Sequence, residues 1–161
     1  MIIIISGVSG VGKTTIGSLL ADELGCFFCD ADDFHSPANV AKMNSGKPLD
    51  DEDRREWLAS LLNLITESVL NRKNIVLACS ALKRAYREYL CISDQVKIIL
   101  LQADFAIIEN RLKLRENHFM SSDLLRSQFE TLEQPFENLI ILDASLSPEM
   151  LVRQIISGIN S

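Results

Sequence analysis

A glycine-rich run after the first apolar segment constrains the fold of this chain more than any other feature. Residues 7–14 read GVSGVGKT and fit the pattern G-x-x-x-x-G-K-[ST] in full, between an expected strand from Ile2 to Ser6 and an expected helix from Thr14 to Leu24. The glycines allow backbone N–H groups to curl around phosphate oxygens, and the helix points the positive end of its dipole at them. The pattern predicts a nucleotide-binding loop. The residues expected to contact the nucleotide are Gly7, Val8, Ser9, Gly10, Val11, Gly12, Lys13, Thr14 and Thr15.

Two side chains of this loop are expected to take part in phosphate chemistry. Lys13 would neutralise the β and γ phosphates of ATP during catalysis, and the Thr14 hydroxyl would bind Mg²⁺. Thr15 fits a helix residue better than a second metal ligand. The competing interpretation, a glycine-rich turn with an unrelated lysine, does not explain why a strand and a helix flank the motif on the required sides.

The rest of the chain alternates short apolar runs with segments of helical periodicity, which is typical of an α/β fold. Each run is apolar on both faces, as a parallel strand covered by helices should be. At 161 residues the chain is expected to form a single domain, a three-layer sandwich with a five-stranded parallel sheet that binds ligands at the carboxyl ends of its strands. The expected strands run from Ile2 to Ser6, Cys26 to Cys29, Asn74 to Cys79, Val96 to Gln102 and Leu139 to Asp143.

Helix starts are marked by capping residues. Ser36 and Ser147 are each followed by proline, which combines an N-cap with the residue favoured at the first helical position. Asp50 or Asp51 is expected to cap a helix that runs to about Leu70.

Composition and charge exclude several classes of protein. The net charge of −6 argues against nonspecific binding to nucleic acid or membranes, which select basic surfaces. The N-terminal MIIIISGVSG lacks a basic region and runs directly into glycines, so we expect a cytoplasmic protein without a signal peptide or membrane span. Cys26 and Cys29 have the C-x-x-C spacing of a redox pair or half a zinc site. An apolar strand between them and the lack of a second ligand pair favour ordinary cysteines.

Motifs beyond the glycine-rich loop narrow the function. Residues 29–35 read CDADDFH, with NVAKM and GKPLDDEDRREWL downstream, CSALKRAYR after the third expected strand, and RLKLRENHF and SQFETLEQP later. Together with GVSGVGKTT, these motifs closely resemble those of the gluconate kinases (gluconokinases), from the first strand to about Pro135. One departure is Ala31, where many members of the family have glycine.

This resemblance implies ATP-dependent phosphorylation of D-gluconate at its 6-hydroxyl, which gives 6-phospho-D-gluconate and ADP. It also implies a P-loop fold similar to those of shikimate and nucleoside monophosphate kinases, with an acceptor-binding helical segment at about residues 35–70 and a lid at about 115–122. Gluconate kinases of this type commonly pair, so a homodimer is expected, although the sequence itself shows no interface.

An acceptor that is a carboxylate with five hydroxyls calls for an arginine that can pair with it and for several short polar groups. Each candidate has a plainer alternative, which is a solvated helix face for the charged residues and a helix start or turn for the smaller ones. The candidates are Arg54, Lys83 and Arg87 for acceptor contacts, with His35, Ser80 and Gln128 as hydrogen-bonding partners.

Arg111 and Arg115 lie four residues apart on an expected helix and would share one face of it. The resemblance suggests that Arg111 stacks on adenine. Arg115 would then be the lid residue that meets charge in the transition state. Solvation at the surface is the alternative for both.

Asp30 and Asp32 lie two apart at the end of an expected strand, so their side chains point the same way, whereas Asp33 points elsewhere. We expect Asp30 to hold Mg²⁺ through water, and Asp32 to orient the gluconate 6-hydroxyl and accept its proton. The alternative is that both only cap the following turn.

Two other functions remain open at this point. One is a kinase of the same fold that acts on another small acceptor, such as shikimate or adenylylsulfate. The other is a nucleotide-binding regulatory module without turnover, although the presence of Lys13, Thr14, Asp30 and Asp32 favours an enzyme.

Overall fold

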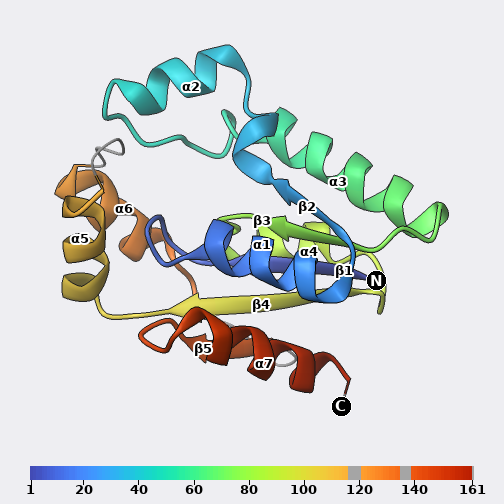
Figure 1. The fold of residues 1–161 in the computed structure, drawn as a ribbon. Coiled ribbons are helices and arrows are strands. Elements are labelled where there is room, and N and C mark those ends of the chain that lie inside the picture. The colour runs from blue at the N-terminus through green and yellow to red at the C-terminus, as the bar shows by residue number, and fades with distance from the viewer. Residues whose placement is uncertain (116–120, 135–138, 161) are drawn as a thin grey trace.

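The computed structural model describes residues 1–115, 121–134 and 139–160, and these residues build a five-stranded parallel sheet (Figure 1). Its strands are β1 (Ile2–Ser6), β2 (Phe27–Asp30), β3 (Ile75–Ala78), β4 (Val96–Gln102) and β5 (Ile140–Asp143). They lie in the order β2-β3-β1-β4-β5, so the strand that leads into the glycine-rich loop is central. The predicted sheet is confirmed, and the strand ends that differ from the prediction do so by a single residue.

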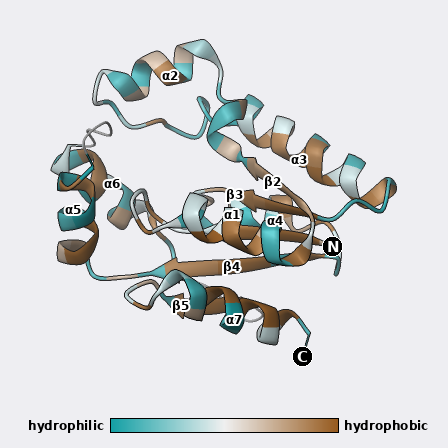
Figure 2. Cartoon of the chain, viewed as in Figure 1, coloured by the Kyte–Doolittle hydropathy of each residue, from teal (hydrophilic) through white to brown (hydrophobic). Residues whose placement is uncertain are grey.

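Helices α1 (Lys13–Leu24) and α7 (Pro148–Ile159) cover one face of the sheet, and α3 (Arg55–Leu70) and α4 (Arg84–Leu90) cover the other, which gives the predicted three layers. A short 3₁₀ helix η1 (Ala31–Phe34), α2 (Pro37–Asn44), α5 (Phe105–Lys113) and α6 (Ser122–Thr131) gather toward the carboxyl ends of the strands (Figure 1). Figure 2 shows hydrophobic residues along the central strands and polar residues on the outer helix faces. In the described part of the chain, no helix is long and apolar enough to cross a membrane.

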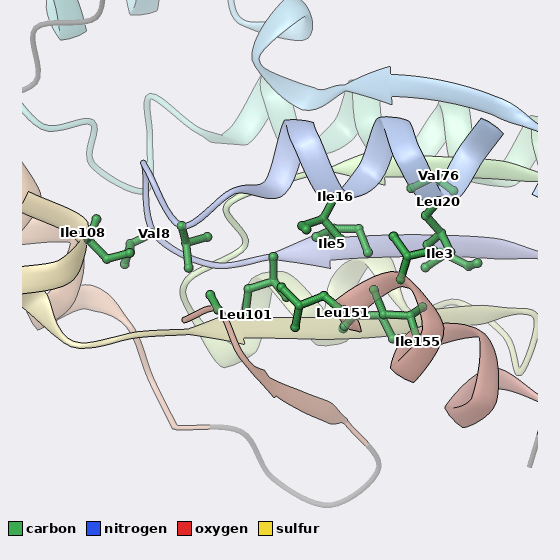
Figure 3. Close-up of a cluster of buried hydrophobic side chains, with 14 of the residues drawn as sticks. Ile3, Ile5, Val8, Ile16, Leu20, Val76, Leu101, Ile108, Leu151 and Ile155 are labelled. Carbon is green, nitrogen blue, oxygen red and sulfur yellow. The ribbon is translucent and has the colours of Figure 1, made fainter. Parts of the chain in front are cut away.

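The alternating side chains of β1 belong to two separate cores. Ile3 and Ile5 pack with α1 and α7, whereas Ile2 and Ile4 pack with α3 and α4. Figure 3 shows the first core, in which side chains of α1 and α7 close over Ile3 and Ile5. Burial of one isoleucine side chain contributes roughly 1.5–3 kcal/mol, so β1 holds the glycine-rich loop on a well-packed support.

Two of the predicted helix caps are confirmed and one is wrong. The Ser36 hydroxyl accepts a hydrogen bond from the N–H of residue 39 at 3.2 Å, and the Ser147 hydroxyl accepts one from the N–H of residue 150 at 3.3 Å. Helix α3, however, begins only at Arg55, and no side chain caps it. Asp50 instead accepts from the N–H of residue 53 at 2.8 Å in the preceding turn, and Asp51 turns toward α4. The acidic run forms a turn of its own before the helix.

The cysteines are all free thiols. Burial raises the pKa of both Cys26 and Cys29, which favours the neutral thiol over the reactive thiolate. Burial also raises the pKa of Cys79, at the end of β3, to about 12. These surroundings support the interpretation of Cys26 and Cys29 as ordinary residues of a strand and its approach.

Candidate active site

The glycine-rich loop follows the carboxyl end of β1 and leads directly into α1. Gly10 and Gly12 have φ angles of 79° and 109°, which residues with side chains rarely adopt. A Cβ at Gly10 would lie 2.8 Å from the side chain of Leu112, because the loop packs directly on α5. On the other side, the carbonyl oxygen of Ser80 accepts a hydrogen bond from the N–H of Gly7 at 3.3 Å. The loop is therefore held between β3 and α5, with the first turn of α1 available to an anion.

Lys13 is the first residue of α1 and lies among the predicted catalytic groups. Its Nζ donates a hydrogen bond to the carbonyl oxygen of Val8 at 2.9 Å. Burial lowers the pKa of Lys13, and the negative charges of Asp32 and Asp30 oppose this effect. The ammonium group is thus within electrostatic reach of both predicted carboxylates.

The next residue, Thr14, meets Asp30 across the site. The Thr14 hydroxyl donates a hydrogen bond to Oδ2 of Asp30 at 3.0 Å, and Oδ1 of Asp30 accepts one from the N–H of Asp32 at 3.0 Å. The end of β2 and the start of α1 therefore bring two oxygen-bearing side chains together. Asp30 also caps η1, as in the alternative considered from the sequence, so the predicted roles of both residues at a metal stay predictions. Thr15 lies exposed on the first turn of α1.

Asp32 and His35 form the adjacent part of the site. Oδ1 of Asp32 lies 3.9 Å from Nε2 of His35. Although 80% of the Asp32 side chain is exposed, partial desolvation by the surrounding protein raises its pKa, and the like charge of Asp30 raises it further. A raised pKa makes this carboxylate a stronger proton acceptor than an ordinary aspartate.

The imidazole of His35 is held by the core beneath it. It stacks on Trp57 with ring centres 4.6 Å apart and planes 10° apart, and the Trp57 Nε1–H donates to the carbonyl oxygen of Ala31 at 2.7 Å. Burial lowers the pKa of His35, with Asp32 opposing this change. Its Nδ1 is buried without a hydrogen-bond partner among the described residues, which also favours the neutral ring.

A second group of polar side chains joins the end of the turn before α3 to α4. Lys83 Nζ lies 2.7 Å and 2.9 Å from the two carboxylate oxygens of Asp51, and the Tyr86 hydroxyl donates to the same carboxylate. Arg54 lies with its guanidinium carbon 5.8 Å from the centre of the Tyr86 ring. Arg54 and Lys83, two of the residues expected to contact the acceptor, thus lie around the same tyrosine ring. Sequence reasoning missed Tyr86, although its position three residues after Lys83 at the start of a helix could have indicated a shared face.

Two side chains expected to contact the acceptor, Arg87 and Gln128, instead make their hydrogen bonds within the chain. Arg87 is only 1% exposed, and its guanidinium donates to the carbonyl oxygens of Ala81, Leu82 and Glu133 at 2.8–3.0 Å. These bonds use both terminal nitrogens to support the chain behind the site, and Nε is buried without a hydrogen-bond partner among the described residues. Gln128 of α6 accepts a hydrogen bond from the Ser9 N–H at 2.7 Å and donates one to the Ser9 hydroxyl at 3.2 Å. Its amide therefore braces the glycine-rich loop.

The two predicted nucleotide arginines do not share a helix face, because α5 ends at Lys113, before Arg115. Arg111 remains on α5 and donates to the carbonyl oxygens of Ala144 at 2.7 Å and Val11 at 3.5 Å, so it joins the glycine-rich loop to the end of β5. Arg115 is exposed, and its charge contributes to the lowered pKa of Lys13. Residues 116–120 of the expected lid lie outside the described residues.

Comparisons with known proteins agree with this geometry. The family model of shikimate kinase matches residues 9–160. A probable gluconokinase of Dictyostelium discoideum is 43% identical, with 96% of this chain and 84% of the relative covered, and a gluconokinase of Arabidopsis thaliana is 41% identical, with coverage of 96% and 90%. A crystal structure of a gluconokinase from Sinorhizobium meliloti superposes with a TM-score of 0.87 at 36% identity, covering 98% of this chain and 90% of that one. The chain therefore belongs to the gluconokinase family of P-loop kinases.

Proposed function

We propose that this protein transfers the γ-phosphoryl group of ATP to the 6-hydroxyl of D-gluconate. The observation that carries the proposal is the surroundings of Asp32, since Asp30 beside it bonds Thr14 of the glycine-rich loop and His35 beside it stacks on Trp57 of α3. Lys13 of the same loop suits the phosphates of the donor, and Arg54 and Lys83, which lie around the Tyr86 ring, suit a carboxylate. A gluconate molecule has its carboxylate and its 6-hydroxyl at opposite ends, which matches this arrangement.

In the proposed reaction, the gluconate 6-oxygen attacks the γ-phosphorus while the bond from that phosphorus to the β,γ-bridging oxygen breaks and ADP leaves. Asp32 orients the hydroxyl and accepts its proton, a task for which its raised pKa is suitable. Lys13 and Arg115 stabilise the charge on the transferring group. Arg111, at the junction of the glycine-rich loop and the end of β5, is proposed to contact the adenine.

Mg²⁺ is the proposed metal. The oxygen atoms of Thr14 and Asp30 lie 3.0 Å apart, and hard oxygen donors are the ligands that Mg²⁺ prefers. The described residues contain no group of three or more His, Cys, Asp or Glu side chains arranged to hold a metal. That fits Mg²⁺, which usually binds through one or two protein oxygens, water and substrate phosphates. When bound, Mg²⁺ would neutralise charge on the β and γ phosphates.

We also propose that the protein is a homodimer and that it is located in the cytoplasm. A homodimer is expected from the family resemblance, and a cytoplasmic location is expected from the N-terminal sequence. Light scattering at micromolar protein tests the first part, since a dimer has twice the mass of the 161-residue chain. A mass equal to that of one chain would contradict the dimer.

A panel of acceptors with coupled detection of ADP tests the function. D-gluconate should be phosphorylated much faster than shikimate or adenylylsulfate, and the product should be a substrate for enzymatic oxidation of 6-phospho-D-gluconate. Faster turnover of another acceptor would assign the site to that compound. ATP consumption at background level with every acceptor would support a binding module instead.

A further inference from the structure

The carboxylate of Asp51 occupies a set of donors that is well suited to an external carboxylate. The Lys83 ammonium contacts both of its oxygens at 2.7 Å and 2.9 Å, and the Tyr86 hydroxyl donates to one of them. Charged donors of this kind make the strongest hydrogen bonds to carboxylates. The hydrogen bonds from Lys83 and Tyr86 hold the pKa of Asp51 below its usual range, so the group is ionised at neutral pH.

The cations of this group outnumber its carboxylate. Arg54 lies beside Lys83 and Asp51, with its guanidinium over the Tyr86 ring and its Nη1 3.5 Å from the Tyr86 hydroxyl. Lys83 also lies over that ring, at 5.7 Å from its centre. Two positive charges thus surround one negative charge, and the excess favours an anion at this position.

The start of α3 joins this group to the Asp32 site, because Arg54 lies over the Tyr86 ring and Trp57, three residues later, stacks on His35. The charge of Arg54 contributes to the lowered pKa of His35 and also to the lowered pKa of Asp51. Arg54 is therefore within electrostatic reach of both, and His35 in turn lies 3.9 Å from Asp32. An acceptor whose hydroxyl lies at Asp32 would extend its far end toward Lys83 and Tyr86.

The side chain of Asp51 can be displaced from Lys83 and Tyr86. It belongs to the turn at residues 51–54 before α3, and its side chain is 66% exposed. An ion pair this exposed is worth no more than about 1 kcal/mol, so a ligand can displace it. Lys83 and Tyr86, in contrast, are tied to the start of α4 and to the core beneath it.

We infer that Asp51 is a stand-in for the acceptor carboxylate, which holds Lys83 and Tyr86 in the acceptor-free enzyme and is displaced when gluconate binds. The inference rests on the proposed function and adds a determinant of specificity to it. A sugar acid can replace Asp51 with its own carboxylate. A neutral polyol has no negative charge to pair with Lys83 after Asp51 is displaced. Asp51 thus competes with the acceptor and selects for anionic ones.

The variant Asp51→Asn tests this competition. Without the internal anion, KM for D-gluconate should fall roughly two- to fivefold, the range expected for loss of a partly exposed ion pair, while kcat and KM for ATP stay within about twofold. Glu52→Gln is the matched control, because it removes the same charge from the next residue, which pairs with Arg55 and not with Lys83. Its KM for gluconate should equal that of the wild type.

Tyr86→Phe, alone and combined with Asp51→Asn, tests whether the Tyr86 hydroxyl binds gluconate or only holds Asp51. If it binds gluconate, its removal raises KM for gluconate even in the Asp51→Asn background. Thermal unfolding of each variant separates this effect from loss of the fold.

The outcomes are distinct. A rise in KM for gluconate or a fall in kcat for Asp51→Asn would show that Asp51 positions Lys83 during catalysis. If Glu52→Gln lowered KM for gluconate as much as Asp51→Asn does, the effect would come from the net charge of the protein. Either result, or an unchanged KM, overturns the inference while leaving the proposed function intact. If the wild-type enzyme did not phosphorylate gluconate at all, the proposed function would fail first.

Discussion

Replacement of Arg87 by methionine should destabilise the protein without removing an acceptor ligand. The guanidinium is 1% exposed and donates to three backbone carbonyls, of Ala81, Leu82 and Glu133. The Leu82 carbonyl keeps the N–H of Glu133 as a donor, whereas the carbonyls of Ala81 and Glu133 lose the donor that Arg87 provides. Each buried carbonyl left without a donor costs roughly 1–3 kcal/mol, and removal of the buried charge returns part of that sum. We expect a net loss of about 3 kcal/mol in the free energy of unfolding. For a chain of 161 residues this lowers Tm by about 6–12 °C.

The assay is denaturant and thermal unfolding of Arg87→Met beside Arg84→Met. Arg84 undergoes the same chemical change on the exposed side of the same helix, where it pairs with Glu88 at 2.8 Å. Loss of that surface pair should change stability by no more than about 0.5 kcal/mol. If Arg87→Met kept the wild-type Tm but raised KM for gluconate by an order of magnitude, the structural role would be refuted and the acceptor role restored.

Other expected outcomes follow from the site. Lys13→Ala should reduce phosphoryl transfer by orders of magnitude with little change in Tm, since the Lys13 ammonium lies at the phosphate loop. An unchanged kcat/KM for ATP in a folded variant would show that Lys13 takes no part in the mechanism. Asp32→Asn should lower kcat by about 10²–10⁴-fold with little effect on ATP affinity, and near wild-type kcat would exclude it as the base. Asp30→Asn should instead raise the Mg²⁺ concentration needed for half-maximal rate, which a magnesium titration measures. Folding lowers the pKa of His35 below its ordinary value of 6.5, so His35 is protonated at a higher pH in the unfolded chain than in the folded one. The free energy of unfolding that His35 contributes is therefore lost as the pH falls below about 6.5. His35→Phe should weaken that pH dependence in urea unfolding, and an identical slope would contradict the buried neutral ring.

The sheet and the phosphate loop were predictable because their physical requirements are local. A parallel strand covered on both faces must be apolar throughout, as in IIIIS, and a phosphate loop needs glycines at fixed spacing before a helix. The alternation argument does not apply to Asp32, because β2 ends at Asp30 and Asp32 lies in η1, where the Asp30 carboxylate caps the turn by accepting from the N–H of Asp32.

The contacts that sequence reasoning missed join distant parts of the chain. Gln128 reaches Ser9 across 119 positions, and Asp51 reaches Tyr86 across 35. Nothing in the pattern around Arg87 tells whether its guanidinium meets solvent, an acceptor or carbonyl groups, because that depends on how the residues before α4 and the segment after α6 pack against this helix. The acidic run before α3 was misassigned for a related reason. Any of its aspartates could cap a helix, and only the tertiary partner Lys83 decides where Asp51 turns.

The strand order β2-β3-β1-β4-β5 places the strands on either side of the phosphate loop in separate stretches of the sequence. The side chains proposed to meet the acceptor, from Asp32 to Tyr86, all belong to one uninterrupted stretch of chain on the β2-β3 side. Arg111, which is proposed to meet the adenine, comes later and lies on the β4-β5 side. A change of acceptor therefore requires alterations within a single continuous module. Exchange of that module between members of the fold is a direct route to new specificities, with the machinery for ATP left in place.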